Sequence, residues 1–597
     1  MCGYIGKISK SVFDYDQASI ANKYTVCRGP DQKIEAYGKS LDFFNTKSLY
    51  HFSIVFNRLS IMELSDLGSQ PVISEDNRYY MIFNGEIFNH NELRKELKND
   101  GIEFRSLSSD TEVLFKGLIN YGVNFIDRLI GQFSIIFFDH YQDRLYLIRD
   151  RLGQKPLFYK LSEDEILFGS NLKSMISLNQ SFEINEESLY EYLASGVVSS
   201  PNTIFKNFKK ITPGSVLTIS LKDFSVVSSF SYWDINSFVS ENKYNLDNFL
   251  DIFNSAVHMR SKADVEVASF LSGGLDSTSI IKMQKQLGLN INSFSMGFSN
   301  KKYDESIWYK NVSKKYNTNH IDETINSDLS IENIFESIDI FDEPYADSST
   351  IPSYYLSKSI SKHYKVAISG DGGDELLGGY EHIHRVLNSK NLSFMKNIYN
   401  LIPYKYGTGS RFMTHYKDND LAHESFFVDK KFINGMNLDY IHPYRDKYMD
   451  PNIDNYKRNV IADYKFYLSE MMLLKIDRTS MSNSLEVRSP FVDHRLVELS
   501  LSTDILSQFT NKPKDTLKTY LADDFDTNFL NRSKQGFAFQ LEDWIFNNIN
   551  FVNEICNDGI TTQINSNIIN NLATFKSRIN SHRIWKIMFI ERYLESI

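Results

Sequence analysis

Two short apolar segments in the second half of the chain are each followed at once by a glycine-rich turn. "VEVASFL" (265–271) precedes "SGGLDS" (272–277), and "HYKVAIS" (363–369) runs into "SGDGGDELLGGY" (369–380). A helical pattern follows the first turn, and another apolar segment lies at 291–298. Continuous apolar strands that alternate with helices are typical of a parallel sheet covered on both faces. The sequence therefore predicts a doubly wound parallel α/β fold for this half.

The two glycine-rich turns also have the composition of a phosphate site. Ser272, Gly273 and Gly274 allow backbone N–H groups to turn inward at a helix N-terminus, which favours an anion. A plain strand-to-helix turn is the alternative interpretation. The clustered carboxylates repel one another unless a cation is present, and Mg²⁺ that bridges phosphate oxygens is usually held by one or two carboxylates. We therefore expect a phosphate ligand with Mg²⁺ held by Asp276 and Asp374.

The first part of the chain, to about residue 210, has a different pattern. "GQFSIIFFD" (131–139) and "DRLYLIRD" (143–150) predict apolar strands, and "YYMIFNGEIFN" (79–89) predicts a strand that runs into an Asn-Gly turn. "NHNELRKELKND" (89–100) has helical spacing, with an Asn cap and a glycine stop. Strands and helices in this order indicate layered α and β structure. The polar segment 235–248 predicts a linker to the second half.

One of three cysteines stands at position 2, in "MCGYIG". Loss of Met1 would place the thiol and a free α-amine on one residue. An α-amine has a pKa of about 8, so it can act as a base beside the thiol, whose thiolate is the nucleophile. The alternative is that an N-terminal residue varies freely and means little. The other two cysteines, Cys27 and Cys556, form no disulfide or zinc pattern, which is typical of a reducing cytosol.

Charge and hydropathy exclude several classes of partner. The chain has 65 Lys and Arg against 75 Asp and Glu, a net charge of −10, whereas a nucleic-acid-binding face would be basic. No apolar run approaches the roughly 20 residues of a membrane helix, and the N-terminus lacks the pattern of a signal peptide. We therefore expect a cytoplasmic protein with no nucleic-acid or membrane partner.

Taken in order, the motifs of both halves resemble those of glutamine-hydrolysing asparagine synthetase. In that family an N-terminal-nucleophile (Ntn) glutaminase is fused to an ATP pyrophosphatase. The resemblance implies an αββα-layered amidotransferase domain at 2–218, a connector at 219–247, and a doubly wound synthetase domain with many helices at 248–597. The motifs that carry it are "MCGYIG", "RGPD" (28–31), "RLSI" (58–61), "QP" (70–71), "NGEIFN" (84–89), "SDTEV" (109–113), "DRLGQKPLFY" (150–159), "SGGLDS", "SGDGGDELLGGY", "SLEVRSPFVD" (484–493) and "KQGF" (534–537).

The resemblance implies roles for residues of the first half in binding and hydrolysing glutamine. An Asn side chain and a backbone N–H suit an oxyanion hole, and a guanidinium suits a carboxylate. An Asn-Gly hairpin turn is the structural alternative for the first pair. The implied residues are Cys2 as nucleophile, Asn84 and Gly85 as oxyanion hole, Arg58 for the α-carboxylate, Glu86 and Asp110 for the α-ammonium, and Leu59 and Ser60 as further contacts.

In the second half the resemblance implies an ATP site with Mg²⁺. Asp276 and Asp374 again match the carboxylates near the metal ion. Asp371 matches a position associated with forming an acyl-adenylate, and Lys534 matches a lysine near the reacting phosphate. The implied ATP contacts are Leu271, Ser272, Gly273, Gly274, Asp276, Ser277, Met296, Ser369 and Gly370.

The implied reaction joins two sites. Glutamine hydrolysis would release ammonia, which would attack an acceptor carboxylate activated by ATP with release of AMP and pyrophosphate. A dry passage between the domains is expected, because ammonium is not nucleophilic and an adenylate hydrolyses in water. The small-molecule substrates would be glutamine, ATP and an acceptor carboxylate. Assembly into a homodimer is left as an open alternative.

The acceptor is the point at which this sequence departs from the family pattern. Asp371 stands where the best-known aspartate-using enzymes have glutamate. Aspartate is the first expectation, and a uronic acid on a nucleotide sugar, used in polysaccharide biosynthesis, is the alternative. Two other interpretations are a closure enzyme of the β-lactam synthetase type and a non-catalytic storage protein. Both fit poorly with Cys2, Arg58, Asn84 and Asp110 occurring together.

Overall fold

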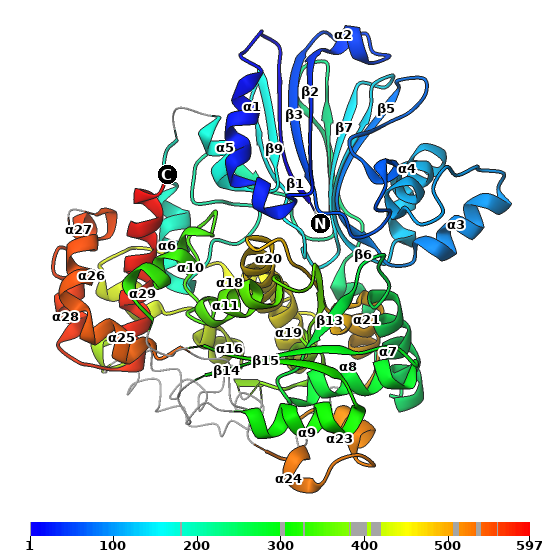
Figure 1. Ribbon diagram of the computed structural model, residues 1–597. Coiled ribbons are helices and arrows are strands. Elements are labelled where there is room, and N and C mark those ends of the chain that lie inside the picture. Colours follow the sequence, from blue (N-terminus) through cyan, green and yellow to red (C-terminus); the bar gives the residue numbers. More distant parts are fainter. Residues whose placement is uncertain are drawn as a thin grey trace.

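The protein is described from a computed structural model in which two parts of the chain stack one above the other (Figure 1). The N-terminus lies at the edge of the upper part that faces the lower part. The structure describes residues 2–178, 182–298, 305–325, 329–380, 382–383, 401, 403–407, 419–504, 513–532, 539–557 and 559–597.

The upper part contains two antiparallel six-stranded sheets that pack face to face. Their facing side chains form a core that includes Tyr4, Phe56, Ile82 and Phe138. The first sheet has the order β10 (Phe208–Lys210), β8 (Phe158–Leu161), β9 (Glu165–Gly169), β1 (Cys2–Ser9), β3 (His51–Arg58), β2 (Gln32–Lys39). The second has the order β12 (Val226–Ser231), β11 (Ser215–Ser220), β7 (Arg144–Arg149), β6 (Gly131–Asp139), β5 (Tyr79–Ile87), β4 (Val72–Ile73).

Helices cover the outer faces of this pair of sheets, which gives the expected αββα layers. On the second sheet, α3 (His90–Asn99) and α4 (Asp110–Tyr121) bury side chains against β5 and β6. The first sheet is covered by α1 (Asp16–Ala21), α5 (Leu172–Ser177) and α6 (Glu186–Ser195). The core beneath α6 continues into the last helix of the chain, α29 (Arg578–Glu595), so the two parts share buried apolar surface.

The lower part is built on a five-stranded parallel sheet, as the sequence predicts. Its order is β15 (Asn319–Ile325), β14 (Asn292–Phe298), β13 (Val267–Phe270), β16 (Val366–Ile368), β17 (Glu486–Arg488). The chain runs from β13 towards β15 on one side and from β16 to β17 on the other. The neighbouring ends of β13 and β16 therefore form a topological switch point, where ligands bind in such sheets.

Helices make up most of the rest of the lower part. The first of them in the chain are α7 (Leu246–Arg260), α8 (Leu275–Gln286), α9 (Ser306–Tyr316), α10 (Ile331–Asp339), α11 (Thr350–Ile360) and α12 (Gly373–Leu377). They are followed by α16 (Asn419–Phe427), α17 (Lys430–Gly435), α18 (Tyr444–Tyr448), α19 (Asn455–Ala462), η8 (Asp463–Met472), α20 (Leu473–Met481), α21 (His494–Ser502), α23 (Asp515–Leu521), α24 (Thr527–Leu530), α25 (Leu541–Asn547), α26 (Ile549–Cys556), α27 (Ile560–Ile564) and α28 (Ile568–Ala573).

The interpretation of Asn84–Gly85 as a turn is wrong. Both residues lie within β5 and pair across to β6, Asn84 with Ser134 and Gly85 with Phe133. Gly85 has a φ of +154°, and a Cβ added to it would lie 2.0 Å from the Gln132 carbonyl oxygen. Glycine is therefore required because the strands approach closely, and the chain does not reverse there.

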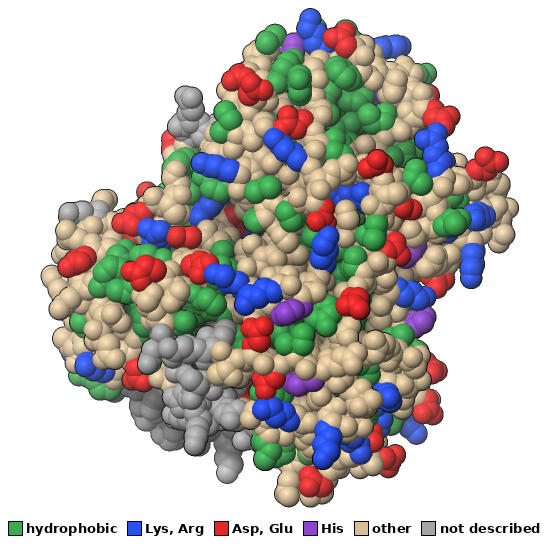
Figure 2. Space-filling model, in the orientation of Figure 1, with side chains coloured by type: hydrophobic (Ala, Val, Ile, Leu, Met, Phe, Trp, Pro, Cys, Tyr) green, Lys and Arg blue, Asp and Glu red, His purple; other side chains and the backbone are tan. Residues whose placement is uncertain are grey.

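The surface and the helices bear on the expected partners. On the face seen in Figure 2, basic and acidic side chains are interspersed and form no single basic patch. In the described part of the chain, no helix is both long enough and apolar enough to cross a membrane.

Candidate active sites

Cys2 lies at the start of β1, buried between the two sheets and paired across the first sheet with Arg58. Its backbone N–H donates to Oδ1 of Asn84 at 2.9 Å. Nδ2 of Asn84 is also buried, and it has no hydrogen-bond partner among the described residues. A buried amide N–H without a partner is costly unless a ligand supplies an acceptor. An oxyanion formed beside the Cys2 sulfur would be such an acceptor.

The surroundings of Cys2 favour the neutral thiol. Burial raises the pKa of the Cys2 thiol, and the Leu59 backbone N–H and the Arg58 guanidinium act in the opposite direction. A thiol with a raised pKa needs a base before it can attack. The candidate base is the amine that loss of Met1 would expose on Cys2 itself.

Arg58 is held by backbone carbonyl groups of the loop that follows it. Its guanidinium donates to the Ser65 carbonyl oxygen at 2.9 Å and also to that of Glu63. Gly68 is pressed against it, since an added Cβ would lie 2.0 Å from Nη2 of Arg58. The neighbouring Ser60 donates its N–H to Asp31 Oδ2 at 2.7 Å. The carbonyl contacts hold the Arg58 side chain in one orientation. They are contacts to uncharged groups, so they do not neutralise the charge of the guanidinium.

Glu86 and Asp110 form a buried acidic pair near Cys2. Burial, followed by the charge of Asp110, raises the pKa of Glu86, and burial likewise raises the pKa of Asp110. Asp110 Oδ2 accepts the Ile87 N–H at 3.0 Å. From the lower part of the molecule, Arg488 approaches Glu86 at 3.4 Å. Arg488 also pairs with the buried Glu486 at 2.5 Å, so one guanidinium serves several buried carboxyl groups. A site with more carboxyl groups than cations suits the ammonium group of a ligand.

The two glycine-rich loops meet at the switch point of the lower sheet. β13 and β16 are paired directly, with Ser269 opposite Ile368. Cβ atoms added to Gly370 and Gly373 would lie 2.9 Å and 2.6 Å from atoms of Asp276. The missing side chains therefore bring the second loop against the first. This packing confirms that both loops lie at one edge of the sheet.

Asp276 and Asp374 converge on a lysine that the sequence analysis missed. Nζ of Lys514 lies 2.5 Å from Asp276 Oδ2 and 2.6 Å from Asp374 Oδ1. Although burial opposes it, the charge of the two carboxylates raises the pKa of Lys514. Gly379 makes room for this lysine, because an added Cβ would lie 2.5 Å from its Cε.

The convergence of Asp276 and Asp374 fits the divalent cation expected from the sequence. Carboxylate oxygens directed at a single positive charge are the ligand type that Mg²⁺ uses with phosphate oxygens. Lys514 also has a φ of +56°. Such strain in a non-glycine residue is often found at functional sites.

The other residues expected at the ATP site lie on or beside these loops. The Leu271 N–H donates to the Phe294 carbonyl oxygen at 2.8 Å, so the end of β13 is tied to β14, which carries Met296. The Ser272 and Ser277 hydroxyls are 3.2 Å apart across the first loop. Oγ of Ser369 is buried without a hydrogen-bond partner among the described residues. Lys534 lies outside the described residues.

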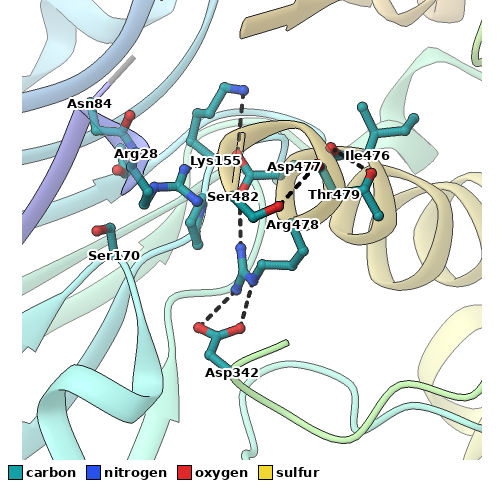
Figure 3. A network of polar contacts seen from close by, with 12 residues as sticks. Arg28, Asn84, Lys155, Ser170, Asp342, Ile476, Asp477, Arg478, Thr479 and Ser482 are labelled. Atoms are coloured by element: carbon teal, nitrogen blue, oxygen red, sulfur yellow. Dashed lines mark hydrogen bonds and ion pairs between the residues drawn. The ribbon is translucent and has the colours of Figure 1, made fainter. Parts of the chain in front are cut away.

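An ion-pair network joins the Cys2 site to α20 of the lower part. Arg28 donates to the Cys2 carbonyl oxygen at 3.2 Å and holds Asp477 of α20 through two bonds of 2.8 and 2.9 Å. Arg478 donates to Asp477 at 2.8 Å and to Asp342 at 2.5 Å. Figure 3 shows Asp477 between Arg478 and Lys155, whose Nζ is 3.6 Å away. Arg28 begins the "RGPD" motif, but nothing in the sequence signals its pairing with Asp477, because the two residues are far apart in the chain.

Comparison with known proteins identifies the family. The asparagine synthase profile matches residues 248–594, and the glutamine amidotransferase domain profile matches residues 1–233. Glutamine-hydrolyzing asparagine synthetase 1 of Bacillus subtilis (strain 168) is 29% identical over 576 residues, with 92% of this chain and 89% of that protein covered. Putative glutamine-hydrolyzing asparagine synthetase 2 of Methanocaldococcus jannaschii is 30% identical over 422 residues, with coverages of 67% and 78%. This chain belongs to the glutamine-hydrolysing asparagine synthetase family.

Proposed function

We propose that the chain is a glutamine-dependent ligase that makes asparagine from aspartate. It would use L-glutamine, L-aspartate, water and ATP, and would release L-glutamate, AMP and pyrophosphate. The observation that carries the proposal is the presence of two separate sites in one chain. One is Cys2 with the unpartnered amide of Asn84, and the other is the pair of glycine loops around Asp276 and Asp374.

In the upper site, the Cys2 sulfur attacks the side-chain amide carbon of glutamine. The exposed α-amine of Cys2 takes the thiol proton and delivers it to the leaving ammonia. The Asn84 Nδ2–H and the Gly85 N–H stabilise the oxyanion. Arg58 binds the α-carboxylate of glutamine, and Glu86 and Asp110 bind its α-ammonium. Water then hydrolyses the thioester, and glutamate leaves.

In the lower site, the acceptor carboxylate attacks the α-phosphorus of ATP and pyrophosphate leaves. The backbone N–H groups of 272–274 and the N-terminus of α8 hold the pyrophosphate. Asp276 and Asp374 would hold Mg²⁺, which neutralises charge on the phosphates when bound. Lys514 balances these carboxylates, and Asp371 assists adenylate formation.

Ammonia needs an apolar path between the two sites, and one buried cluster supports such a path. Leu59 and Ile61, which follow Arg58, pack against Val366 and Met481 of the lower part. Leu59 also neighbours the Cys2 thiol, and Val366 begins the strand that leads into the second glycine loop. We propose that ammonia crosses beside this cluster, where burial excludes the water that would protonate it.

Identifying the acceptor requires a direct assay. Purified protein is incubated with ATP, Mg²⁺ and glutamine, and with either aspartate or a panel of sugar uronic acids, and amides are identified by mass spectrometry. We expect asparagine, with AMP released in equal amount. A uronamide formed without asparagine would overturn aspartate as the acceptor. It would favour the alternative acceptor, a uronic acid on a nucleotide sugar. Formation of ADP in place of AMP would contradict the whole reaction scheme.

The network around Asp477 should couple the two sites. We expect Asp477→Asn to lower the amide formed per glutamate released by about tenfold, the size typical of a loss of coupling between sites. Asp477 holds α20, which carries Met481 of the proposed ammonia path, against Arg28 beside Cys2, so its loss would let ammonia escape at the junction. Loss of one partner of this buried ion pair should also lower the stability of the fold by about 3–5 kcal/mol. Glutamate and amide are quantified in the same reaction by chromatography.

The matched control for this prediction is Asp493→Asn. Asp493 is a fully buried carboxylate that pairs with Arg260 at 2.8 Å and Arg495 at 2.9 Å, within the lower part alone. It should lower stability and leave the ratio of amide to glutamate near that of the native protein. Equal ratios in the two variants would show that Asp477 serves stability only.

A further inference from the structure

Two histidines and an aspartate meet in the interior beyond the second glycine loop. Nε2 of His382 lies 3.0 Å from Asp463 Oδ2, and Nε2 of His423 lies 3.0 Å from Asp463 Oδ1. His423 comes from α16, Asp463 is the first residue of η8, and His382 follows the loop that ends at Tyr380. One ligand atom from each residue can be chosen so that all three lie within 4.8 Å of one another.

The side chains of the three residues lie largely within the interior. The side chains of His423 and Asp463 are 0% exposed, and that of His382 is 13% exposed.

Two of the three ligand-atom distances are close to those in the first coordination shell of a transition-metal ion. Zinc binds His nitrogen and Asp oxygen at about 2.0–2.2 Å in a tetrahedron, which places neighbouring ligand atoms about 3.3 Å apart. The two pairs of 3.0 Å are close to that spacing. Both histidines present Nε2, and Nδ1 of His423 faces the Tyr444 hydroxyl at 3.4 Å. A metal-bound histidine usually has such an outer partner on its second nitrogen.

We propose that His382, His423 and Asp463 bind a divalent transition-metal ion of the zinc class, separate from the Mg²⁺ of the ATP site. Two imidazoles with one carboxylate favour zinc over Mg²⁺, which prefers oxygen ligands. Three protein ligands leave a fourth position for water, on the side where His382 is exposed. Asp463 also begins a π-helical segment, a feature frequent at functional sites.

The metal ion would stabilise the position of the second glycine-rich loop. The His382 ring stacks on Tyr380 with centroids 5.4 Å apart, and the Tyr380 hydroxyl donates to Glu375 at 2.9 Å. A ligand bond to His382 would therefore fix the end of this loop against α16 and η8.

The test measures metal content and does not rely on activity. The full chain, cleared of metal with a chelator, is incubated with ZnCl₂ in the presence of excess MgCl₂, dialysed and analysed by elemental and native mass spectrometry. We expect about one zinc ion per chain. Asp463→Asn and His423→Gln should each weaken zinc binding by about 100-fold or more. The matched control is His442→Gln, which changes another buried histidine near Tyr444 and should keep the zinc.

Two outcomes would overturn the metal site. The first is the absence of bound zinc in native protein of intact fold. The second is equal zinc content in His423→Gln and the native protein. If the variants fail to fold, titration of the metal-free native protein with Co²⁺ decides the question, because bound cobalt with histidine ligands has a visible absorption spectrum. A spectrum that stays that of aqueous Co²⁺ would mean that the three residues only hydrogen-bond to one another.

Discussion

Cys2→Ala is expected to abolish glutamine-dependent amide formation while ammonia-dependent formation continues. Loss of the nucleophile should lower the rate of glutamine hydrolysis by at least about 10⁴-fold, since no other group can form the thioester. Alanine keeps the start of β1 and its N–H bond to Asn84, so the upper site should stay folded. Ammonium chloride then replaces glutamine as the nitrogen source, and the two rates are compared by following AMP release.

Two controls make this result specific to Cys2. Cys27→Ala removes a partly buried thiol near the same junction and should leave both rates unchanged. The intact mass of active protein should correspond to a chain without Met1, because the proposed base is the amine of Cys2. If Cys2→Ala also stopped the ammonia-dependent reaction, the two sites would not be separable. An active protein that retained Met1 would rule out the free amine as base.

Asp276→Asn is expected to have the opposite pattern. It should lower AMP formation by about 10²–10³-fold with either nitrogen source, as is usual when one preorganised electrostatic group is lost. Asparagine nearly preserves the shape that packs against Gly370 and Gly373, but it removes one of the two charges that face Lys514. Hydrolysis of glutamine should remain measurable by glutamate release.

The matched control for this variant is Asp247→Asn, on an exposed turn of α7 in the same part of the molecule. It removes the same charge far from the loops and should leave AMP formation unchanged. Full activity of Asp276→Asn would exclude Asp276 from the nucleotide site. Loss of glutamine hydrolysis as well would mean that the variant disturbs the junction and not only the lower site.

Local patterns in the sequence were sufficient to predict the layers of the fold. β6 begins and ends at the residues that "GQFSIIFFD" predicts, and the parallel sheet follows from apolar runs that precede glycine. Burial on both faces requires continuous apolar residues, and that requirement is visible in a short window. Cys2, Asn84 and Asp276 were predicted as site residues for a similar reason, since rare residue types and glycine clusters are local signals.

The tertiary structure alone decided how these signals combine. Asn84–Gly85 has the composition of a turn, yet pairing with β6 keeps it in a strand. β17 is only three residues long, too short for a periodic signal, and it becomes a strand because β16 is beside it.

The ion pairs between residues distant in the chain could not be predicted from the sequence either. Lys514 meets Asp276, Arg28 meets Asp477, and His423 meets Asp463, each across many residues of chain. The sequence around a single lysine or histidine does not identify its ion-pair partner, because that partner depends on how distant elements pack. Local sequence patterns therefore predicted most of the elements, and rare residue types marked the candidates for chemistry. Packing determined which charges are buried together, because the cost of burying a charge depends on its neighbours in space and not along the chain.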